Sequence, residues 1–436
     1  MKYAQFLLLL LAAGCSQQLM PSPNIYVGSK KDCFDNVAQC YKCNDVDVLY
    51  VTDRAPLESP IDNRHYGTAR SDTLVYGLCT VSIGKDLKWP DLVSDSRTAS
   101  RRHDLSLACP KIQELGHMPK TPFGLVSVNG AWVDDPAAVA EAISTRDAFW
   151  KLLADRVAKT PDKREAYVFI HGFNNSMEYA AGVMAELWHF MGRQGVPIIY
   201  TWPAGESYAY DRESGEFTLF HLKQFLRCLG ACPSIDKVHI IAHSRGTDVT
   251  LSALRELNIE FRCSSEAGGA RLKLGNVVLA AADLDIQVVR QRIVAERLPL
   301  MPERMTVYCS PTDKAIGAAQ WLFKSNRRLG DLEPQDLTPM MRERLADVAQ
   351  LQIIQARVKS NMLGHDYFHS NPAVSSDMIL MLRDNRAPGA ATGRPLKELF
   401  QNFWEIDDKY MLAAKQTGDQ RTSVAPSGLP GVAESR

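Results

Sequence analysis

The second half of the chain alternates short, continuous apolar runs with longer stretches of helical periodicity. The apolar runs cover residues 167–170, 197–202, 238–242, 276–281 and 305–309. The helical stretches between them cover residues 176–192, 217–228, 248–257 and 287–297. Apolar strands separated by amphipathic helices are typical of a parallel sheet that is covered on both faces. The pattern therefore predicts an α/β fold with a mostly parallel sheet, in which ligands bind beyond the carboxyl ends of the strands.

The flanking regions give a less regular pattern. Strand-like runs at 46–52, 74–83 and 123–128 are separated by turn-rich stretches, and residues 134–158 have the pattern of a helix. The stretch 320–361 is helical and charged with no strand signal, which predicts a helical insertion that is either a lid or a peripheral addition. We expect the main domain to span residues 46–385. Residues 386–436 are expected to form an amphipathic segment at 396–414, which docks on the body, and then a disordered tail.

The N-terminus has the pattern of an export signal. Lys2 precedes an apolar run at 6–13 that is too short to span a bilayer, since a spanning helix needs about 20 residues. The sequence L-L-A-A-G-C resembles a bacterial lipobox, so residues 1–15 are expected to be a lipoprotein signal peptide whose Cys15 is acylated; the alternative is an ordinary cleaved signal with an incidental Cys15. Residues 16–45 then read as a tether that includes a Cys-rich segment with Cys33, Cys40 and Cys43. This predicts a soluble body anchored by lipid in the cell envelope, at the outer membrane or in the periplasm of a Gram-negative cell.

Composition excludes several classes of partner and cofactor. The 50 Lys and Arg residues balance 50 Asp and Glu residues, and no basic or aromatic stripe indicates nucleic acid. Of the ten cysteines, nine remain if Cys15 is acylated, and an exported protein can oxidise them. Cys40-x-x-Cys43 has no second ligand pair, so disulfides or buried thiols are favoured over a metal site. The pairing of the cysteines cannot be derived from the sequence.

One apolar run ends at a serine with small neighbours. In V-H-I-I-A-H-S-R-G-T-D-V, Ser244 follows a predicted strand and precedes a predicted helix, with Ala242 and Gly246 two positions to either side. A serine on a sharp strand-to-helix turn needs small residues there, because strand and helix approach closely. The short motif alone is weak, but its context predicts that Ser244 is a nucleophile.

A serine nucleophile needs a base and a group that orients the base. In this topology, an acid and then a histidine follow the serine along the chain. Asp313 comes directly after the last strong strand, and His365 follows Gly364 in G-H-D-Y-F. Asp283 is a second candidate for the acid, although it could equally cap the next helix. We favour Ser244, Asp313 and His365 as a catalytic triad.

The site also needs donors for an oxyanion and a surface for substrate. The backbone amide of Arg245 and that of Phe173, in V-F-I-H-G-F-N-N-S, are the expected oxyanion donors. His171, Trp202 and Tyr208 lie at or after the ends of strands and are candidates for substrate binding, although they could simply be packing residues. This chemistry requires no metal and no organic cofactor.

Taken together, these motifs resemble a family. V-F-I-H-G-F-N-N-S-M-E, I-I-Y-T-W-P-A-G, I-A-H-S-R-G, V-V-L-A-A-A-D-L-D and L-G-H-D-Y-F are similar to segments of a bacterial family of α/β-hydrolases of poorly defined function, whose members are often esterase- or lipase-like and lipid-anchored. The resemblance covers about residues 46–385. It implies the α/β-hydrolase fold and the triad Ser244, Asp313 and His365, and it implies no defined substrate.

The sequence therefore favours a lipid-anchored serine hydrolase that cleaves a small-molecule or lipid ester. Two alternatives stay open. One is an envelope lipoprotein that keeps an idle hydrolase fold, since a fold alone does not confer a function. The other is an acyltransferase, which shares the acyl-enzyme and differs in the nucleophile that resolves it.

Overall fold

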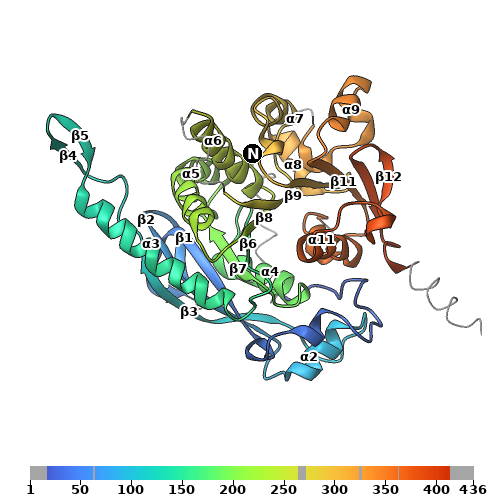
Figure 1. The fold of residues 1–436 in the computed structure, drawn as a ribbon. Helices are drawn as coiled ribbons and strands as arrows, with labels where there is room; N and C mark the ends of the chain where they lie inside the picture. The colour runs from blue at the N-terminus through green and yellow to red at the C-terminus, as the bar shows by residue number, and fades with distance from the viewer. Residues whose placement is uncertain (1–16, 62–63, 264–271, 324–326, 362, 413–436) are drawn as a thin grey trace, which may run out of the picture.

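A single large sheet runs through the part of the molecule that the computed structural model describes, namely residues 17–61, 64–263, 272–323, 327–361 and 363–412 (Figure 1). Its eleven strands have the order β12-β13-β11-β10-β9-β8-β6-β7-β1-β2-β3. Every pairing from β13 to β1 is parallel. The pairings at the two edges, β12 with β13 and β1 through β2 to β3, are antiparallel. The predicted α/β fold with a mostly parallel sheet is confirmed.

The bounds of the elements are as follows. The strands of the large sheet are β1 (Asp45–Ile61), β2 (Arg64–Ile83), β3 (Leu107–His117), β6 (Glu165–Ile170), β7 (Val196–Thr201), β8 (Lys237–His243), β9 (Leu274–Ala280), β10 (Arg304–Cys309), β11 (Leu351–Arg357), β12 (Lys397–Phe400) and β13 (Phe403–Asp407). The α-helices are α2 (Trp89–Ser96), α3 (Pro136–Val157), α4 (Met177–Phe190), α5 (Tyr208–Ala231), α6 (Gly246–Cys263), α7 (Ile286–Val288), α8 (Lys314–Phe323), α9 (Pro339–Ala346), α10 (Tyr367–Ser370) and α11 (Pro372–Asp384). Helix α7 continues into a π-helical turn, η4 (Val289–Val294), and η5 (Leu298–Leu300) is a short 3₁₀-helix.

Each face of the sheet has its own hydrophobic core, because successive side chains of a strand point to opposite faces. Along β8, Ile240 and Ala242 belong to one core and Ile241 to the other. Helices α4 and α11 cover the face of Ile241, whereas α3, α5 and α6 cover the opposite face. Burial on both sides explains why the central strands read as continuous apolar runs.

Two expectations about the C-terminal third are wrong. The stretch 320–361 holds α9 and the end of α8, but it also contains β11, which lies inside the sheet between β10 and β13. The main domain does not end at residue 385, since β12 and β13 extend the same sheet where an amphipathic segment was expected. Strands β12 and β13 are short, which makes them hard to recognise in the sequence. Strand β11 carries the polar Gln352 and Gln355, so its pattern of apolar and polar residues resembles that of a helix. The predicted tail beyond residue 412 lies outside the described residues.

The expected tether at 16–45 is also wrong for the residues that the structure describes. Leu19, Met20, Tyr26 and Phe34 are each 2 % exposed and belong to the core on the α4 face. The amide of Met20 donates to the carboxylate of Glu186 on α4 (2.8 Å). Residues 17–44 are therefore a packed part of the domain. A composition rich in Pro, Ser, Asn and Lys hid these few apolar anchors.

A two-stranded arm projects from the sheet on the long helix α3 (Figure 1). It consists of β4 (Leu125–Val128) and β5 (Ala131–Asp134), which form a separate sheet. Trp132 in the arm is 72 % exposed and Leu125 is 61 % exposed. The predicted helix at 134–158 is confirmed as α3.

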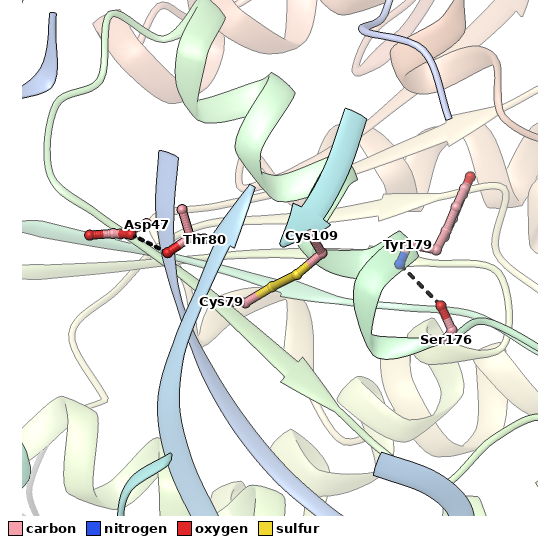
Figure 2. The surroundings of a disulfide bond; sticks show 6 residues. All are labelled: Asp47, Cys79, Thr80, Cys109, Ser176 and Tyr179. Carbon is pink, nitrogen blue, oxygen red and sulfur yellow. Dashed lines mark hydrogen bonds between the residues drawn. A yellow bond between two sulfur atoms is a disulfide. The ribbon is translucent and has the colours of Figure 1, made fainter. Parts of the chain in front are cut away.

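One disulfide joins the edge strands of the sheet. Cys79 on β2 is bonded to Cys109 on β3, next to the hydrogen bond from Thr80 on β2 to Asp47 on β1 (Figure 2). Among the described residues, the other cysteines are free thiols: Cys33, Cys40, Cys43, Cys228, Cys232, Cys263 and Cys309. The clusters at 33–43 and 228–232, which stand out in the sequence, are thus not paired here.

The predicted acylation site, Cys15, lies outside the described residues. Within them, no helix combines the length and the apolar character that crossing a bilayer requires.

Candidate functional site

Ser244 stands on a sharp turn between β8 and α6. Its φ of +53° lies in the left-handed region, which a residue with a Cβ adopts only at a cost. Three bonds fix this conformation: the Ser244 amide donates to Ala280 O (3.0 Å), and Ser244 O accepts from the amide and the hydroxyl of Thr247 (3.1 and 2.6 Å). The predicted strand–turn–helix context of the serine is confirmed.

Two glycines make this turn possible. A Cβ on Gly246 would come within 2.4 Å of His171 O and 2.6 Å of Ile170 O, so that α6 could not approach β6. A Cβ on Gly172 would lie 2.8 Å from Ser244 Cβ and 3.3 Å from Ser244 Oγ. The loop after β6 therefore passes directly against the serine side chain, and any larger residue would displace one or the other.

Asp313 and His365 form a pair beyond the carboxyl ends of the strands. His365 Nδ1 lies 2.8 Å from Asp313 Oδ2, and the other carboxylate oxygen accepts from the amides of Ala315 and Ile316 (3.0 and 3.1 Å). Burial lowers the pKa of His365, but the Asp313 carboxylate opposes it, and the net pKa is raised above its ordinary value. The Asp313 side chain is fully buried, while that of His365 is 21 % exposed. The Nδ1 side of the imidazole is thus held by a buried carboxylate, while part of the ring remains exposed.

His365 lies near the serine because it contacts His243, the residue that precedes Ser244. His243 Nε2 donates to His365 O (3.1 Å), and the two imidazole centroids are 4.7 Å apart. Burial and then the nearby His365 lower the pKa of His243 well below its ordinary range, so it stays neutral. Among the described residues, the Ser244 hydroxyl makes no hydrogen bond, so the contact from serine to imidazole is not closed in this structure. Such contacts are often long without substrate and tighten when it binds.

The competing acid, Asp283, is engaged elsewhere. Its carboxylate lies 2.6 Å from Arg328 Nη1 and accepts a hydrogen bond from the Tyr208 hydroxyl. Its backbone amide donates to Ser244 O (3.4 Å), so Asp283 lies at the site without contacting the Nδ1 of His365. The geometry favours Asp313 as the partner of the histidine.

The two expected oxyanion donors are free in the described part of the chain. Neither the amide of Phe173 nor that of Arg245 donates to another described residue. The loop that carries Phe173 is held by Asp211, whose carboxylate accepts from the amides of Asn174 (3.1 Å) and Gly205 (2.8 Å). Asp211 is 1 % exposed, so it cannot orient a substrate from the surface. Its role in holding this loop was missed from the sequence.

Two of the three candidates for substrate binding do not reach the site. His171 and Trp202 have no exposed surface, and their rings are stacked on each other at a centroid distance of 5.5 Å. Burial and the neighbouring Arg54 lower the pKa of His171 to about 3, so it is a neutral packing residue. Tyr208 is partly exposed, and its ring lies 5.5 Å from that of Phe173. Only Tyr208 remains a candidate for contact with substrate.

Arg54 was not recognised from the sequence. Its guanidinium is buried and donates to Thr201 Oγ1 (2.9 Å), Ala204 O (3.1 Å) and Asn175 O (2.7 Å). It therefore ties β1 to the loops after β6 and β7 that border the site. Only the T-D-R run within β1 hints at a buried charge, and no residue near it in the sequence indicates the partners.

A second arrangement of carboxylate, imidazole and hydroxyl lies away from Ser244. His221 Nδ1 is 3.0 Å from Asp53 Oδ2, and His221 Nε2 is 2.8 Å from Thr121 Oγ1. All three residues are buried, with Thr121 at 7 % exposure. No local pattern in the sequence indicates this cluster, because its members come from β1, α5 and the segment after β3.

Within the described residues, no group of three or more His, Cys, Asp or Glu side chains is arranged to hold a metal ion.

The comparison with protein families agrees with the fold. Residues 145–384 match the family described as "Alpha/beta hydrolase of unknown function (DUF900)". No curated protein matches the chain. Among solved structures, a CE15 glucuronoyl esterase from Teredinibacter turnerae T7901 aligns at 9 % identity over 88 % of this chain and 80 % of that one, with a TM-score of 0.18.

Proposed function

Because the chain belongs to the DUF900 family of alpha/beta hydrolases of unknown function, we propose that it is a serine hydrolase that cleaves carboxylic esters. The observation that carries the proposal is the Asp313–His365 pair, 2.8 Å apart, at the strand ends beside a serine in the left-handed conformation. A buried carboxylate on Nδ1 leaves Nε2 as the proton acceptor, which is the tautomer that a general base needs.

The proposed reaction passes through an acyl-enzyme. Ser244 Oγ attacks the carbonyl carbon while His365 Nε2 takes the hydroxyl proton and Asp313 stabilises the imidazolium. The amides of Phe173 and Arg245 donate to the oxygen that becomes negative. His365 then gives its proton to the departing alcohol. A water molecule, deprotonated by the same imidazole, attacks the acyl-enzyme and releases the acid and Ser244.

The groups next to Ser244 are mixed in polarity, which supports an ester over a purely apolar ligand; Asp283 and Arg328 are buried, and Tyr208 is partly exposed. The Tyr208 hydroxyl, the Asp283 carboxylate and the Arg328 guanidinium lie together next to the backbone of Ser244. The Phe173 and Tyr208 rings supply the apolar part of the same region. This mixture suits a substrate that presents a carbonyl and an oxygen-bearing leaving group.

Hydrolysis of a p-nitrophenyl ester series, from acetate to palmitate, tests the proposal. The protein is residues 16–436, which contain every described residue. We expect turnover by the wild type and a loss of at least ~10³-fold in kcat/KM for Ser244→Ala and His365→Ala. A matched control is His117→Gln, which replaces an exposed histidine on β3 and should keep full activity. No turnover on any ester, together with no labelling of Ser244 by a fluorophosphonate, would identify an idle hydrolase fold.

The proposal includes an envelope location through an acylated Cys15. The lipobox-like L-L-A-A-G-C supports it. Feeding cells an alkyne fatty acid should label the full chain, and Cys15→Ala should remove the label. Equal labelling of both chains would refute the anchor and leave the proposed chemistry untouched.

A further inference from the structure

An exposed surface of aliphatic side chains lies on the α6, α7, η4 and η5 elements. Ile259 is 38 % exposed, Val288 40 %, Val294 45 % and Leu300 51 %. These elements pack together, since the side-chain amide of Asn258 on α6 donates to Glu296 O (3.0 Å) between η4 and η5. We call these four residues, with the arginines described next, the η4 surface.

Three arginines are interleaved with the aliphatic side chains. Arg290, Arg292 and Arg297 are exposed, and none of them forms an ion pair with a described residue. Of the acidic side chains on this stretch, Glu296 pairs with Arg255 (2.6 Å), whereas Asp285 caps α7 through the amide of Gln287 (2.7 Å) and keeps its negative charge. In a chain with no net charge, the three arginines of the η4 surface therefore exceed the one carboxylate beside them that has no cationic partner among the described residues.

The η4 surface begins at the rim of the candidate site. Asp283 and Asp285 directly precede α7, and Asp283 contacts the backbone of Ser244. The amide of Ile286 donates to Arg327 O (3.1 Å), next to the Arg328 that binds Asp283. In Figure 1, α7 lies beside α6, on the opposite side of the molecule from α2. A membrane that binds the η4 surface would therefore lie next to the segment that leads from Asp283 to α7.

We propose that the η4 surface docks on an anionic lipid bilayer and presents Ser244 to esters at that surface. Arginines alternating with aliphatic residues on a short helical segment suit this occupant: the aliphatic groups enter the acyl boundary, and the arginines attract anionic headgroups. The exposed arm around Trp132 does not share this chemistry, because Asp134 and Asp135 are its charged neighbours. Docking on the bilayer is independent of the proposed function, whereas the presentation of Ser244 to an ester rests on it.

Vesicle sedimentation with residues 16–436 tests the docking without any acyl anchor. We expect binding to vesicles with 30 mol % phosphatidylglycerol, little binding to pure phosphatidylcholine, and weakening by salt. Replacing Arg290, Arg292 and Arg297 together by Gln should lower the partition coefficient about fivefold per arginine, ~100-fold in all. Lys85, Lys111 and Lys151, replaced together by Gln, remove the same charge from exposed positions on other elements and should change binding little.

The outcomes separate the two proposals. If the wild type binds anionic vesicles but hydrolyses no ester, docking stands and the proposed function fails. If it hydrolyses soluble esters but does not bind anionic vesicles, or if both triple variants lose binding equally, docking is overturned and the hydrolase stands. With both correct, the arginine variant keeps its rate on p-nitrophenyl acetate and loses its rate on an ester embedded in anionic vesicles. Leu300→Asn should weaken binding without changing its dependence on salt.

Discussion

Among the described residues, two arrangements combine a carboxylate, an imidazole and a hydroxyl, and they differ in their surroundings. In the first, Asp313 holds His365 beside Ser244; in the second, Asp53 holds His221, which contacts Thr121. The carboxylate–imidazole distances are 2.8 and 3.0 Å. Hydrogen-bond geometry between acid and base therefore does not distinguish them.

The surroundings distinguish the two arrangements. The His365 side chain is 21 % exposed, against 3 % for His221. The Thr121 hydroxyl also contacts Asp72 O (3.1 Å), whereas Ser244 Oγ has no partner among the described residues. Asp53 further accepts hydrogen bonds from Thr218 (2.6 Å) and Tyr200 (3.4 Å). The second arrangement is thus a buried network that joins β1, α5 and the base of the arm through Asp53 Oδ2, and its hydroxyl already has an acceptor.

The largest expected difference comes from removing the two hydroxyls. Ser244→Ala should lower kcat/KM by at least ~10³-fold and leave the melting temperature nearly unchanged. Thr121→Val should keep kcat/KM within about threefold. The same variant leaves His221 Nε2 without a partner, which should lower the free energy of unfolding by about 1–3 kcal/mol. Ester hydrolysis and urea unfolding measure the two effects. Loss of activity in folded Thr121→Val would show that the second arrangement takes part in the reaction.

Variants of the two carboxylates, Asp313 and Asp53, should also differ in whether they affect activity or stability. Asp313→Asn should lower kcat by up to ~10⁴-fold, because the amide favours the wrong tautomer of His365. Asp53→Asn should instead destabilise the fold by about 1–3 kcal/mol, since it disturbs bonds from three side chains, and should spare kcat in the folded fraction. Steady-state kinetics, measured at a temperature below the melting temperatures of both variants, distinguishes the effect on kcat from the effect on stability. Similar kcat losses in both variants would contradict the comparison.

A smaller effect is expected from the glycine that borders the serine. Gly172→Ala introduces a Cβ 2.8 Å from Ser244 Cβ and should cost about 10²-fold in kcat, because small displacements of reacting groups are costly. Gly317→Ala on α8 is the matched control, since its Cβ would meet no atom within 4 Å. Equal activity of the two variants would show that the loop carrying Phe173 does not need its position against Ser244.

The smallest effect is a shift in the pH profile. His365 must be neutral to act as a base, and its pKa is raised by Asp313 against the effect of burial, so kcat/KM should rise through a midpoint above 6.5. Asp313→Asn should move the midpoint of the residual activity downwards. Stability has the opposite sign: the contribution of protonated His365 is present below its unfolded pKa and is lost as pH rises through its folded pKa. A midpoint at or below 6.5 in the wild type would contradict this electrostatic account.

The sequence predicted the central strands and helices well because their signals are local. The turn at Ser244 and the order of Ser244, Asp313 and His365 followed from strand ends and small neighbours. Strand β11 was missed because Gln352 and Gln355 interrupt its apolar run, and β12 and β13 were missed because they have only four and five residues. The apolar anchors of residues 17–44 are sparse. Whether these segments pack into the domain depends on the surface that they contact in the fold, and a local sequence pattern holds no information about that surface.

The contacts between side chains that are distant in the sequence were decided by the tertiary structure alone. The Cys79–Cys109 bond and the Asp53–His221 contact join residues from separate elements, and nothing near either partner in the sequence specifies the other. The exclusion of His171 and Trp202 from the site was settled by burial, a property of the whole packed body. The sequence determined which backbone segments form strands and helices and where a nucleophile can stand, because these depend on neighbours along the chain. The fold determined which polar groups meet and which of them reach solvent, because those depend on neighbours across it.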